Sequence, residues 1–417
     1  MKNEKIQNFI KTLGPGILFA STAIGVSHLV QSTRAGANFG FALIPFILAA
    51  NIFKYPFFEF GSRYANTAGE SIIDGYKRIG SWMLWVYFII TIGSMFFVSA
   101  AVGAVTSGFL QNLFGISHWG IWSTLGLFCI CTLILMLGKY KILDSMIKII
   151  GAVLLLSTLL AFVLALVKGP SQQIPNFLPP EIWSDKSIIF IIALMGWMPT
   201  AVDLSAWNSL WTIERIKQTG YKPKLKETLA DFNFGYIISV VLSICFVTLG
   251  SYMMFGTGKV LPNSSGAFAN SVVEMFTTFI GKWSYFIIAI ASFCIMFGTC
   301  IAVFDGYSRS IKRSAELLFF NNKNKNKNIY SISLCIVVLG AFGIVFFLGN
   351  QLKQLVDLAT TISFLIAPII AIVNYKLVTS KKFPEEAHPK LWLKILSYLG
   401  IIFLSGFALY FTWIQFK

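Results

Sequence analysis

Long apolar segments alternate with short polar ones along nearly the whole chain. An α-helix needs about 20 apolar residues to cross a bilayer, whereas a transmembrane β-strand needs only about 10 with alternating polarity. The apolar segments are too long and too uniformly apolar for such strands, so the pattern predicts an all-α protein with many membrane spans. We expect eleven spanning helices, at 14–36, 41–60, 82–113, 120–138, 144–167, 187–210, 231–255, 268–304, 329–349, 354–376 and 392–414.

Two of these segments contain an interruption at mid-length. In the first, residues 23–28 bring a glycine, a serine and a histidine into the apolar run. In the second, residues 195–203, Pro199 removes a backbone hydrogen bond and disturbs the carbonyl group four residues earlier. Secondary transporters bind their cargo at such discontinuous helices near the bilayer midplane. The sequence therefore predicts that the first and sixth helices are discontinuous and face each other across an ion site.

The residues that could bind an ion there offer freed carbonyl groups, hydroxyls, a thioether and two ionisable side chains. The candidate substrate-binding residues are Gly25, Ser27, His28, Met195, Met198, Thr200 and Asp203, and the candidate metal ligands are His28 and Met198. Structural alternatives exist: the glycine permits close packing, the histidine bonds a neighbouring backbone, the methionine packs in the core, and the aspartate bonds Trp207, Asn208 or a helix end. Other ionisable residues inside apolar segments are Lys54, Glu59, Asp231, Asp305 and Asp357.

Composition agrees with a membrane protein. The chain has 417 residues, of which 56% are hydrophobic and 12% charged, whereas soluble domains carry about 25% charged residues. The six cysteines lie inside apolar runs, as expected of buried thiols. We find no nucleophile–base pair, phosphate-binding loop or His/Cys metal cluster in the sequence, so we expect neither an enzyme nor a bound cofactor.

The formal net charge of +16 does not indicate nucleic-acid binding, because Lys and Arg do not form one patch. They concentrate in alternate loops, as the positive-inside rule requires. Counted this way, the N-terminus is cytoplasmic, the C-terminus is extracytoplasmic, and the number of spans is odd. The segment 1–11 is polar and basic and lacks a cleavage site, so we expect no cleaved signal peptide. We expect a multi-pass protein of the cell (inner) membrane.

The positions of the two interruptions suggest an inverted repeat. Repeat 1 would cover about 12–168 and repeat 2 about 186–377, each beginning with its discontinuous helix, and 391–415 would be an additional helix. The whole chain, 1–417, is then a single transmembrane domain.

Several motifs resemble those of the NRAMP family of divalent-metal transporters. Residues 14–16 (Gly-Pro-Gly) and 35–37 (Ala-Gly-Ala) resemble the frame of that family's first helix. Residues 63–71 and 113–115 resemble the ends of its helices 2 and 3, and residues 198–199 match the start of its Met-Pro-His motif. The resemblance implies a LeuT-type 5+5 inverted-repeat fold with about eleven helices, alternating access, and a divalent metal ion as cargo.

The metal ligands of the family carry over only in part. Residues 25–28 read Gly-Val-Ser-His where the family has Asp-Pro-Gly-Asn, so the metal-binding carboxylate falls at Gly25 and the asparagine at His28. Met198 and the carbonyl group of Met195 match family ligands, whereas the motif histidine falls at Thr200. The acidic residues of the family's helix 3 fall at Ser99 and Val102.

These features predict a secondary active transporter of a small inorganic ion, with H⁺ or Na⁺ as a coupling ion. The resemblance favours a divalent metal ion such as Mn²⁺ or Fe²⁺, while loss of the carboxylate favours an altered cargo, and a small anion such as bicarbonate is the alternative. A non-transporting sensor is a second alternative and a channel a further one. The expected partners are the small ion and the lipid bilayer, with no nucleic acid and no obligate protein partner.

Overall fold

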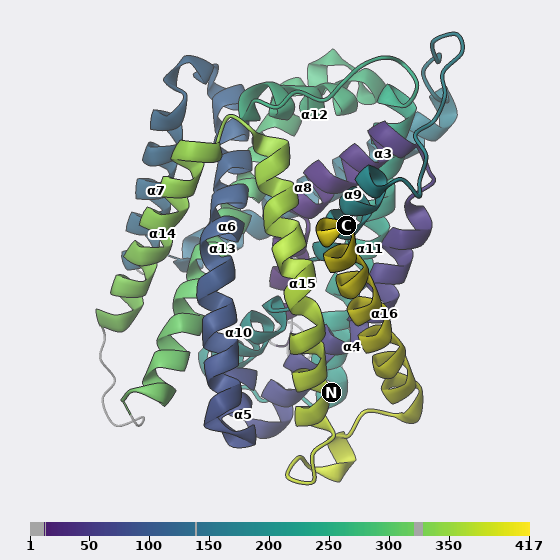
Figure 1. Cartoon of the computed structure of the whole chain (residues 1–417). Helices are drawn as coiled ribbons and strands as arrows, with labels where there is room; N and C mark the ends of the chain where they lie inside the picture. The colour runs from purple at the N-terminus through teal and green to yellow at the C-terminus, as the bar shows by residue number, and fades with distance from the viewer. Residues whose placement is uncertain (1–11, 13, 138–139, 321–327) are drawn as a thin grey trace, which may run out of the picture.

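The computed structural model describes residues 12, 14–137, 140–320 and 328–417, and these residues contain helices but no strand. The predicted all-α class is confirmed (Figure 1). The basic segment 1–11, which contributes to the predicted orientation, lies outside the described residues. The elements are α2 Pro15–Ala23, the π-helix η1 Ser27–Ser32, α3 Thr33–Phe39, α4 Ile44–Ala68, α5 Ile72–Ile79, α6 Ser81–Phe114, η2 Ser117–Trp119, α7 Ile121–Met136, α8 Tyr140–Lys168, α9 Asp185–Gly196, α10 Leu204–Thr219, α11 Leu225–Met254, α12 Ser265–Ile280, η3 Lys282–Ser284, α13 Tyr285–Leu318, α14 Asn328–Leu348, α15 Leu352–Val378, η4 Glu385–Ala387 and α16 Leu391–Phe416.

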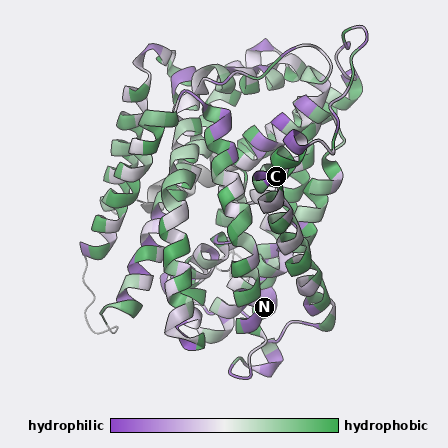
Figure 2. Ribbon diagram, viewed as in Figure 1, coloured by the Kyte–Doolittle hydropathy of each residue, from purple (hydrophilic) through white to green (hydrophobic). Residues whose placement is uncertain are grey.

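Six helices of the described residues are each long and apolar enough to cross a membrane: α6, α11, α13, α14, α15 and α16. α14 and α16 bury little of their apolar surface inside the protein, and large side chains such as Leu339, Phe347 and Ile402 point outward. Hydrophobic colouring accordingly covers the outer helices (Figure 2). Because contiguous apolar surface of this extent is stable only in contact with lipid, the chain is a multi-pass membrane protein.

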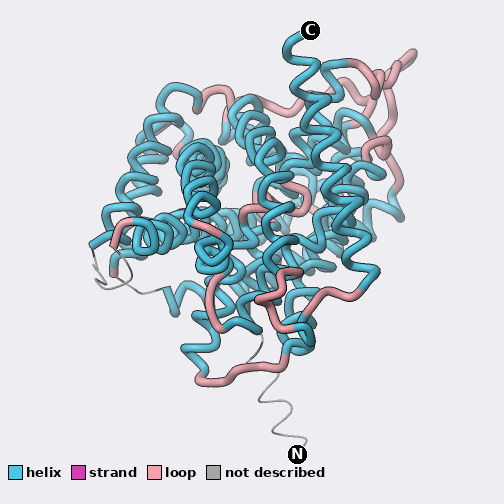
Figure 3. The backbone as a smooth tube through the Cα atoms, turned by 60° about the horizontal axis from the view of Figure 1, so that its bottom comes forward, coloured by secondary structure: helices cyan, strands magenta, loops and turns pink. Residues whose placement is uncertain are grey.

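The first predicted span is made of separate pieces. α2 ends at Ala23, the backbone bends at Ile24 and Gly25, and η1 and α3 continue the path to Phe39. The sixth is also divided, because α9 ends at Gly196 and α10 begins at Leu204. Loop segments therefore lie within the helical bundle as well as at its ends (Figure 3).

The two divided paths lie among the longest helices. α2 packs on α11 and α13, α9 packs on α15, and α10 packs on α4. α4 is continuous from Ile44 to Ala68 and ends at Gly69, whose φ of 71° closes the helix in the left-handed conformation. α4 also contacts α9, so one long helix supports both sides of the division between α9 and α10.

One predicted span is wrong. The single helix expected at 268–304 is two elements, α12 and α13, separated at Gly281. The φ of Gly281 is 125°, a conformation that side-chain-bearing residues avoid and that ends a helix. α12 lies across the end of the molecule where α3 ends, while α13 runs through the bundle (Figure 1). The last helix, α16, runs from the end near α5 toward the end near α3 and α12 (Figure 1).

Candidate functional site

The division between α9 and α10 leaves carbonyl groups without helical partners. Residues 197–203 are not helical, and the Met198–Pro199 peptide bond is cis. Three predicted site residues are buried here: Met195 in the last turn of α9, and Met198 and Thr200 in the non-helical segment. A buried carbonyl group must find a donor elsewhere, and these find it in one side chain of another helix.

That side chain is Lys54 of α4, which is fully buried. Its Nζ donates to the carbonyl oxygens of Met195 at 2.9 Å, Gly196 at 2.9 Å, Met198 at 3.0 Å and Thr200 at 2.9 Å. We call these four oxygens the carbonyl cage. An ammonium group has three N–H donors, so four acceptors at these distances share them around one buried cation.

Asp203 supplies a negative charge beside the carbonyl cage. It is 6% exposed, it interacts electrostatically with Lys54, and it accepts a hydrogen bond from Tyr307 of α13. A carboxylate and an ammonium group buried together leave the site without net charge, which lowers the penalty of burying each. The predicted site residue Asp203 therefore belongs to this site through its interaction with Lys54.

The bend in the first path is fixed by close packing at Gly25. A Cβ atom at this position would lie 2.8 Å from Cγ2 and 3.1 Å from Oγ1 of Thr299 on α13. Thr299 is held in turn, since its Oγ1 donates to the carbonyl oxygens of Ser21 at 3.2 Å and Ile295 at 3.0 Å. Position 25, where the resemblance places the family's carboxylate, therefore has no room for a side chain.

We expect Gly25→Ala to destabilise the protein by about 1–3 kcal/mol through overpacking. Thr299→Ala should recover most of that loss in the double variant, because it removes both atoms that the new methyl group meets. Thermal unfolding in detergent, followed by tryptophan fluorescence, measures both effects. Equal losses for Gly25→Ala with and without Thr299→Ala would contradict the packing explanation.

Ser27 and His28 are buried, and the His28 ring turns toward α11. Nε2 of His28 lies 2.8 Å from the Ser239 carbonyl oxygen, and Nδ1 lies 2.8 Å from the Ala23 carbonyl oxygen and 2.7 Å from Oγ of Ser27. The Ser27 hydroxyl itself donates to the Ala23 carbonyl. Both ring nitrogens thus have protein partners, and the expected pair of His28 and Met198 is not formed.

The two divided paths nevertheless meet, at a different residue. Oγ of Ser32, in η1, donates to Sδ of Met198 at 3.7 Å, and both residues are fully buried. Of the family-type ligands, the Met195 carbonyl is thus bonded to Lys54 and the Met198 thioether to Ser32. Among the described residues, no three His, Cys, Asp or Glu side chains lie close enough together to hold a metal ion.

A polar network closes the α3 side of this region. Arg34 donates to both carboxylate oxygens of Asp357, at 2.6 and 2.8 Å, and to Oε1 of Gln31 at 2.8 Å. Gln31 donates in turn to Asp357 at 3.0 Å and to Thr360 at 3.3 Å. The network joins the first divided path to α15, and α9 packs against the same helix through Gly196, where an added Cβ atom would lie 2.0 Å from the Thr360 carbonyl oxygen.

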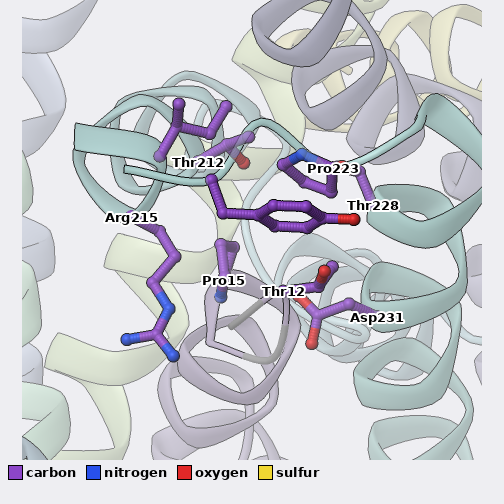
Figure 4. Close-up of a pocket in the computed structure, with 9 residues that line it drawn as sticks. Thr12, Pro15, Thr212, Arg215, Pro223, Thr228 and Asp231 are labelled. Carbon is purple, nitrogen blue, oxygen red and sulfur yellow. The ribbon is translucent and has the colours of Figure 1, made fainter. Parts of the chain in front are cut away.

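The other side is closed where α2 begins. Asp231 of α11 accepts from the backbone N–H groups of Gly14, at 3.4 Å, and Gly16, at 2.7 Å. A carboxylate at a helix start satisfies free N–H groups and complements the helix dipole. A small pocket opens here, with Arg215 and Asp231 on opposite sides of Pro15 (Figure 4).

Sequence analysis did not predict the roles of Lys54, which bonds the carbonyl cage, and of Ser32, which bonds Met198. The signal for Lys54 was present, because an ionisable residue inside an apolar span is usually functional. Its partners are backbone carbonyls more than 140 residues away in sequence, and these have no signature of their own. Ser32 carries no signal beyond being a hydroxyl in an apolar helix.

Known proteins place the chain in a family. Residues 16–414 match the family model for natural resistance-associated macrophage protein-like (Nramp) proteins. A protein of Pasteurella multocida described as uncharacterized is 33% identical over 403 residues, covering 96% of this chain and 91% of that protein. The divalent metal cation transporter MntH of Levilactobacillus brevis is 22% identical, covering 98% of this chain and 90% of that protein.

Solved structures agree on the fold. A crystal structure of a variant of the Eremococcus coleocola manganese transporter superposes with a TM-score of 0.67 at 14% identity, covering 96% of this chain and 86% of that one. MhsT in complex with L-phenylalanine superposes with a TM-score of 0.56 at 12% identity, covering 94% of this chain and 98% of that one. The family match spans nearly the whole described protein, including both divided helices, and the chain therefore belongs to the Nramp family.

Proposed function

We propose that this protein is a secondary active transporter that moves a small inorganic ion across the membrane by alternating access. The observation that carries the proposal is the buried meeting of the two divided helices at Ser32 and Met198. Ser32, Lys54 and the residues of the carbonyl cage are all buried, so an ion can reach them only if the helices around them move. Kinship with proteins named as transporters supports transport rather than catalysis.

A divalent metal ion is the first candidate cargo, and kinship supports it. The MntH relatives are named as divalent metal cation transporters, and the superposed Eremococcus coleocola protein as a manganese transporter. The thioether of Met198 is a suitable ligand for soft or borderline transition metals. Coupling to H⁺ or Na⁺ is part of the proposal, because uphill transport needs a second gradient.

A small anion is the second candidate, and one observation favours it. Lys54 puts a positive charge in the carbonyl cage, while no carboxylate stands at position 25. The ammonium group by itself would repel a dication about 5 Å from its nitrogen by roughly 7 kcal/mol at an effective dielectric constant of about 20, and the attraction of Asp203 opposes this repulsion. An anion would meet no such repulsion from Lys54.

Uptake into proteoliposomes tests the proposal. The purified protein is reconstituted, a proton or sodium gradient is imposed, and uptake of Mn²⁺ and of labelled bicarbonate is measured against protein-free liposomes. We expect saturable, gradient-dependent uptake of one of the two ions. Flux of neither ion, together with calorimetric binding of one, would overturn transport in favour of a sensor.

Two methionine variants identify the cargo. Met198→Ala removes the thioether at the site, and Met83→Ala removes a buried methionine of α6 outside it. Mn²⁺ uptake that is lost in Met198→Ala and kept in Met83→Ala would establish the metal ion as cargo. Bicarbonate uptake without Mn²⁺ uptake would establish the anion.

A further inference from the structure

The carbonyl cage has the geometry of a cation site. Four carbonyl oxygens, two from the end of α9 and two from the non-helical segment that follows it, surround the Lys54 nitrogen at 2.9–3.0 Å. Convergent carbonyl dipoles are what proteins use to hold a dehydrated cation. In this protein the cation at that point is a covalently attached ammonium group.

The charge balance around Lys54 supports the same interpretation. Glu59, the nearest acidic residue along α4, is bonded to Arg63 at 2.8 Å. Asp203 is the carboxylate that interacts with Lys54, so the pair supplies one positive and one negative charge. With the ammonium group in place, the cage needs no further cation to satisfy its oxygens or to balance Asp203.

We propose that Lys54 is a tethered cation that occupies the carbonyl cage in place of a diffusible metal ion and is thereby the residue that excludes divalent cations from this site. The inference rests on the proposed transport function only in treating the α9–α10 division as part of the cargo site. It makes a divalent metal ion the less favoured of the two candidate cargo ions, because the Met195 carbonyl oxygen is hydrogen-bonded to Lys54 and is not available to a metal ion.

The proposal also explains why Lys54 can stay fully buried. Without its N–H donors the carbonyl oxygens of Gly196, Met198 and Thr200 would lose this buried donor, and that of Met195 would keep only the Met198 N–H at 3.3 Å. Each buried unsatisfied polar group is destabilising. If Lys54 were only a structural donor, a small uncharged side chain would leave a cage that binds nothing. If it stands in for a metal ion, the emptied cage with Asp203 beside it binds one.

The test is Mn²⁺ or Cd²⁺ titration of purified Lys54→Ala in detergent, followed by thermal unfolding. Alanine empties the cage, whereas Lys54→Met removes the charge but keeps the volume filled, and is the matched control. We expect a saturable rise of the unfolding midpoint in Lys54→Ala, and no such rise in the wild type or Lys54→Met. The metal concentration that gives half of the rise in Lys54→Ala should be at least roughly tenfold below the highest concentration at which the wild type shows none, equal to about 1.4 kcal/mol.

Two results would overturn the proposal. One is a folded, monodisperse Lys54→Ala protein that shows no metal-dependent rise. The other is tight binding of Mn²⁺ to the wild type at a site that Met198→Ala abolishes. If Lys54→Ala does not survive extraction, calorimetric titration of the wild type and Met198→Ala with Mn²⁺ tests the proposal. The proposal requires that the wild type show no Mn²⁺ binding that Met198→Ala abolishes.

The outcome is separable from that of the transport assay. Metal binding to Lys54→Ala in detergent needs no flux, so a protein that carries no ion in liposomes can still confirm the role of Lys54. Conversely, Met198-dependent Mn²⁺ binding and uptake by the wild type would overturn the role of Lys54 and leave the transport function standing.

Discussion

Asp203→Asn is expected to lower the stability of the folded protein by about 3 kcal/mol, since it leaves the Lys54 ammonium group buried without a neutralising charge. The substitution changes little else. Asparagine has nearly the same shape, and its side-chain oxygen can still accept the hydrogen bond from Tyr307. The loss of stability therefore reports the effect of the charge alone. It is measured from the thermal unfolding midpoint and from unfolding by denaturant in detergent.

The double variant with Lys54→Met makes the measurement specific. Either single substitution leaves one buried charge unpaired, whereas both together leave none, so the double variant should lose less than the sum of the two singles. We expect a coupling energy of about 1–3 kcal/mol. Glu274→Gln, an exposed site on α12, is the control and should change stability by less than about 0.5 kcal/mol. Additive losses would contradict a charge pair between Lys54 and Asp203.

The placement of Lys54 bears on how such a transporter moves. Lys54 bonds the end of α9 and the non-helical segment that follows it to α4, a helix that is continuous over 25 residues. We expect this division to move together with α4 rather than to bend by itself. Access to the site would then depend on movement of the first divided path.

Much of the fold could be predicted from the sequence because a helix that crosses lipid needs a long apolar segment. The length of each apolar segment indicates where a helix lies, and Gly and Pro inside such a segment mark where the helix is interrupted. The segments 23–28 and 195–203 were found in this way. The span at 268–304 was not, because Gly281 looked like one more small residue in an apolar helix and its positive φ shows only in the folded chain.

The site was harder to predict because partners are chosen in three dimensions. His28 was expected to face Met198, but the Ala23 carbonyl at the end of α2 and the Ser239 carbonyl of α11 hold its ring elsewhere. Lys54 was visible as an expensive residue in an apolar span, yet its acceptors are backbone atoms, which every residue has. Sequence motifs record side chains, and here the decisive acceptors are peptide groups.

Asp357→Asn is expected to lower the stability of the protein and to increase local opening of α3 and of the first turns of α15. Arg34 is 6% exposed and pairs with both carboxylate oxygens of Asp357. Without that charge Arg34 keeps Gln31 and the face of the Phe190 ring, 4.9 Å away, neither of which neutralises it. The Asp357 side chain is 30% exposed, so water lessens the penalty, and we expect a loss of about 2 kcal/mol rather than that of a fully buried pair.

Hydrogen–deuterium exchange tells local opening from general weakening. We expect amide exchange in α3 and in the first turns of α15 to become roughly tenfold faster, since about 1.4 kcal/mol of local opening free energy corresponds to a factor of ten, while exchange in α4 and α13 stays as in the wild type. Glu70→Gln removes an exposed pair, with Arg78 at 2.9 Å, and should leave exchange in α3 unchanged. Uniformly faster exchange in every helix would mean that Arg34 and Asp357 stabilise the whole protein and do not act as a closure of one side. Faster exchange confined to α3 and α15 would instead identify this ion pair as the contact that must break for an ion to reach Ser32 and Met198 from that side.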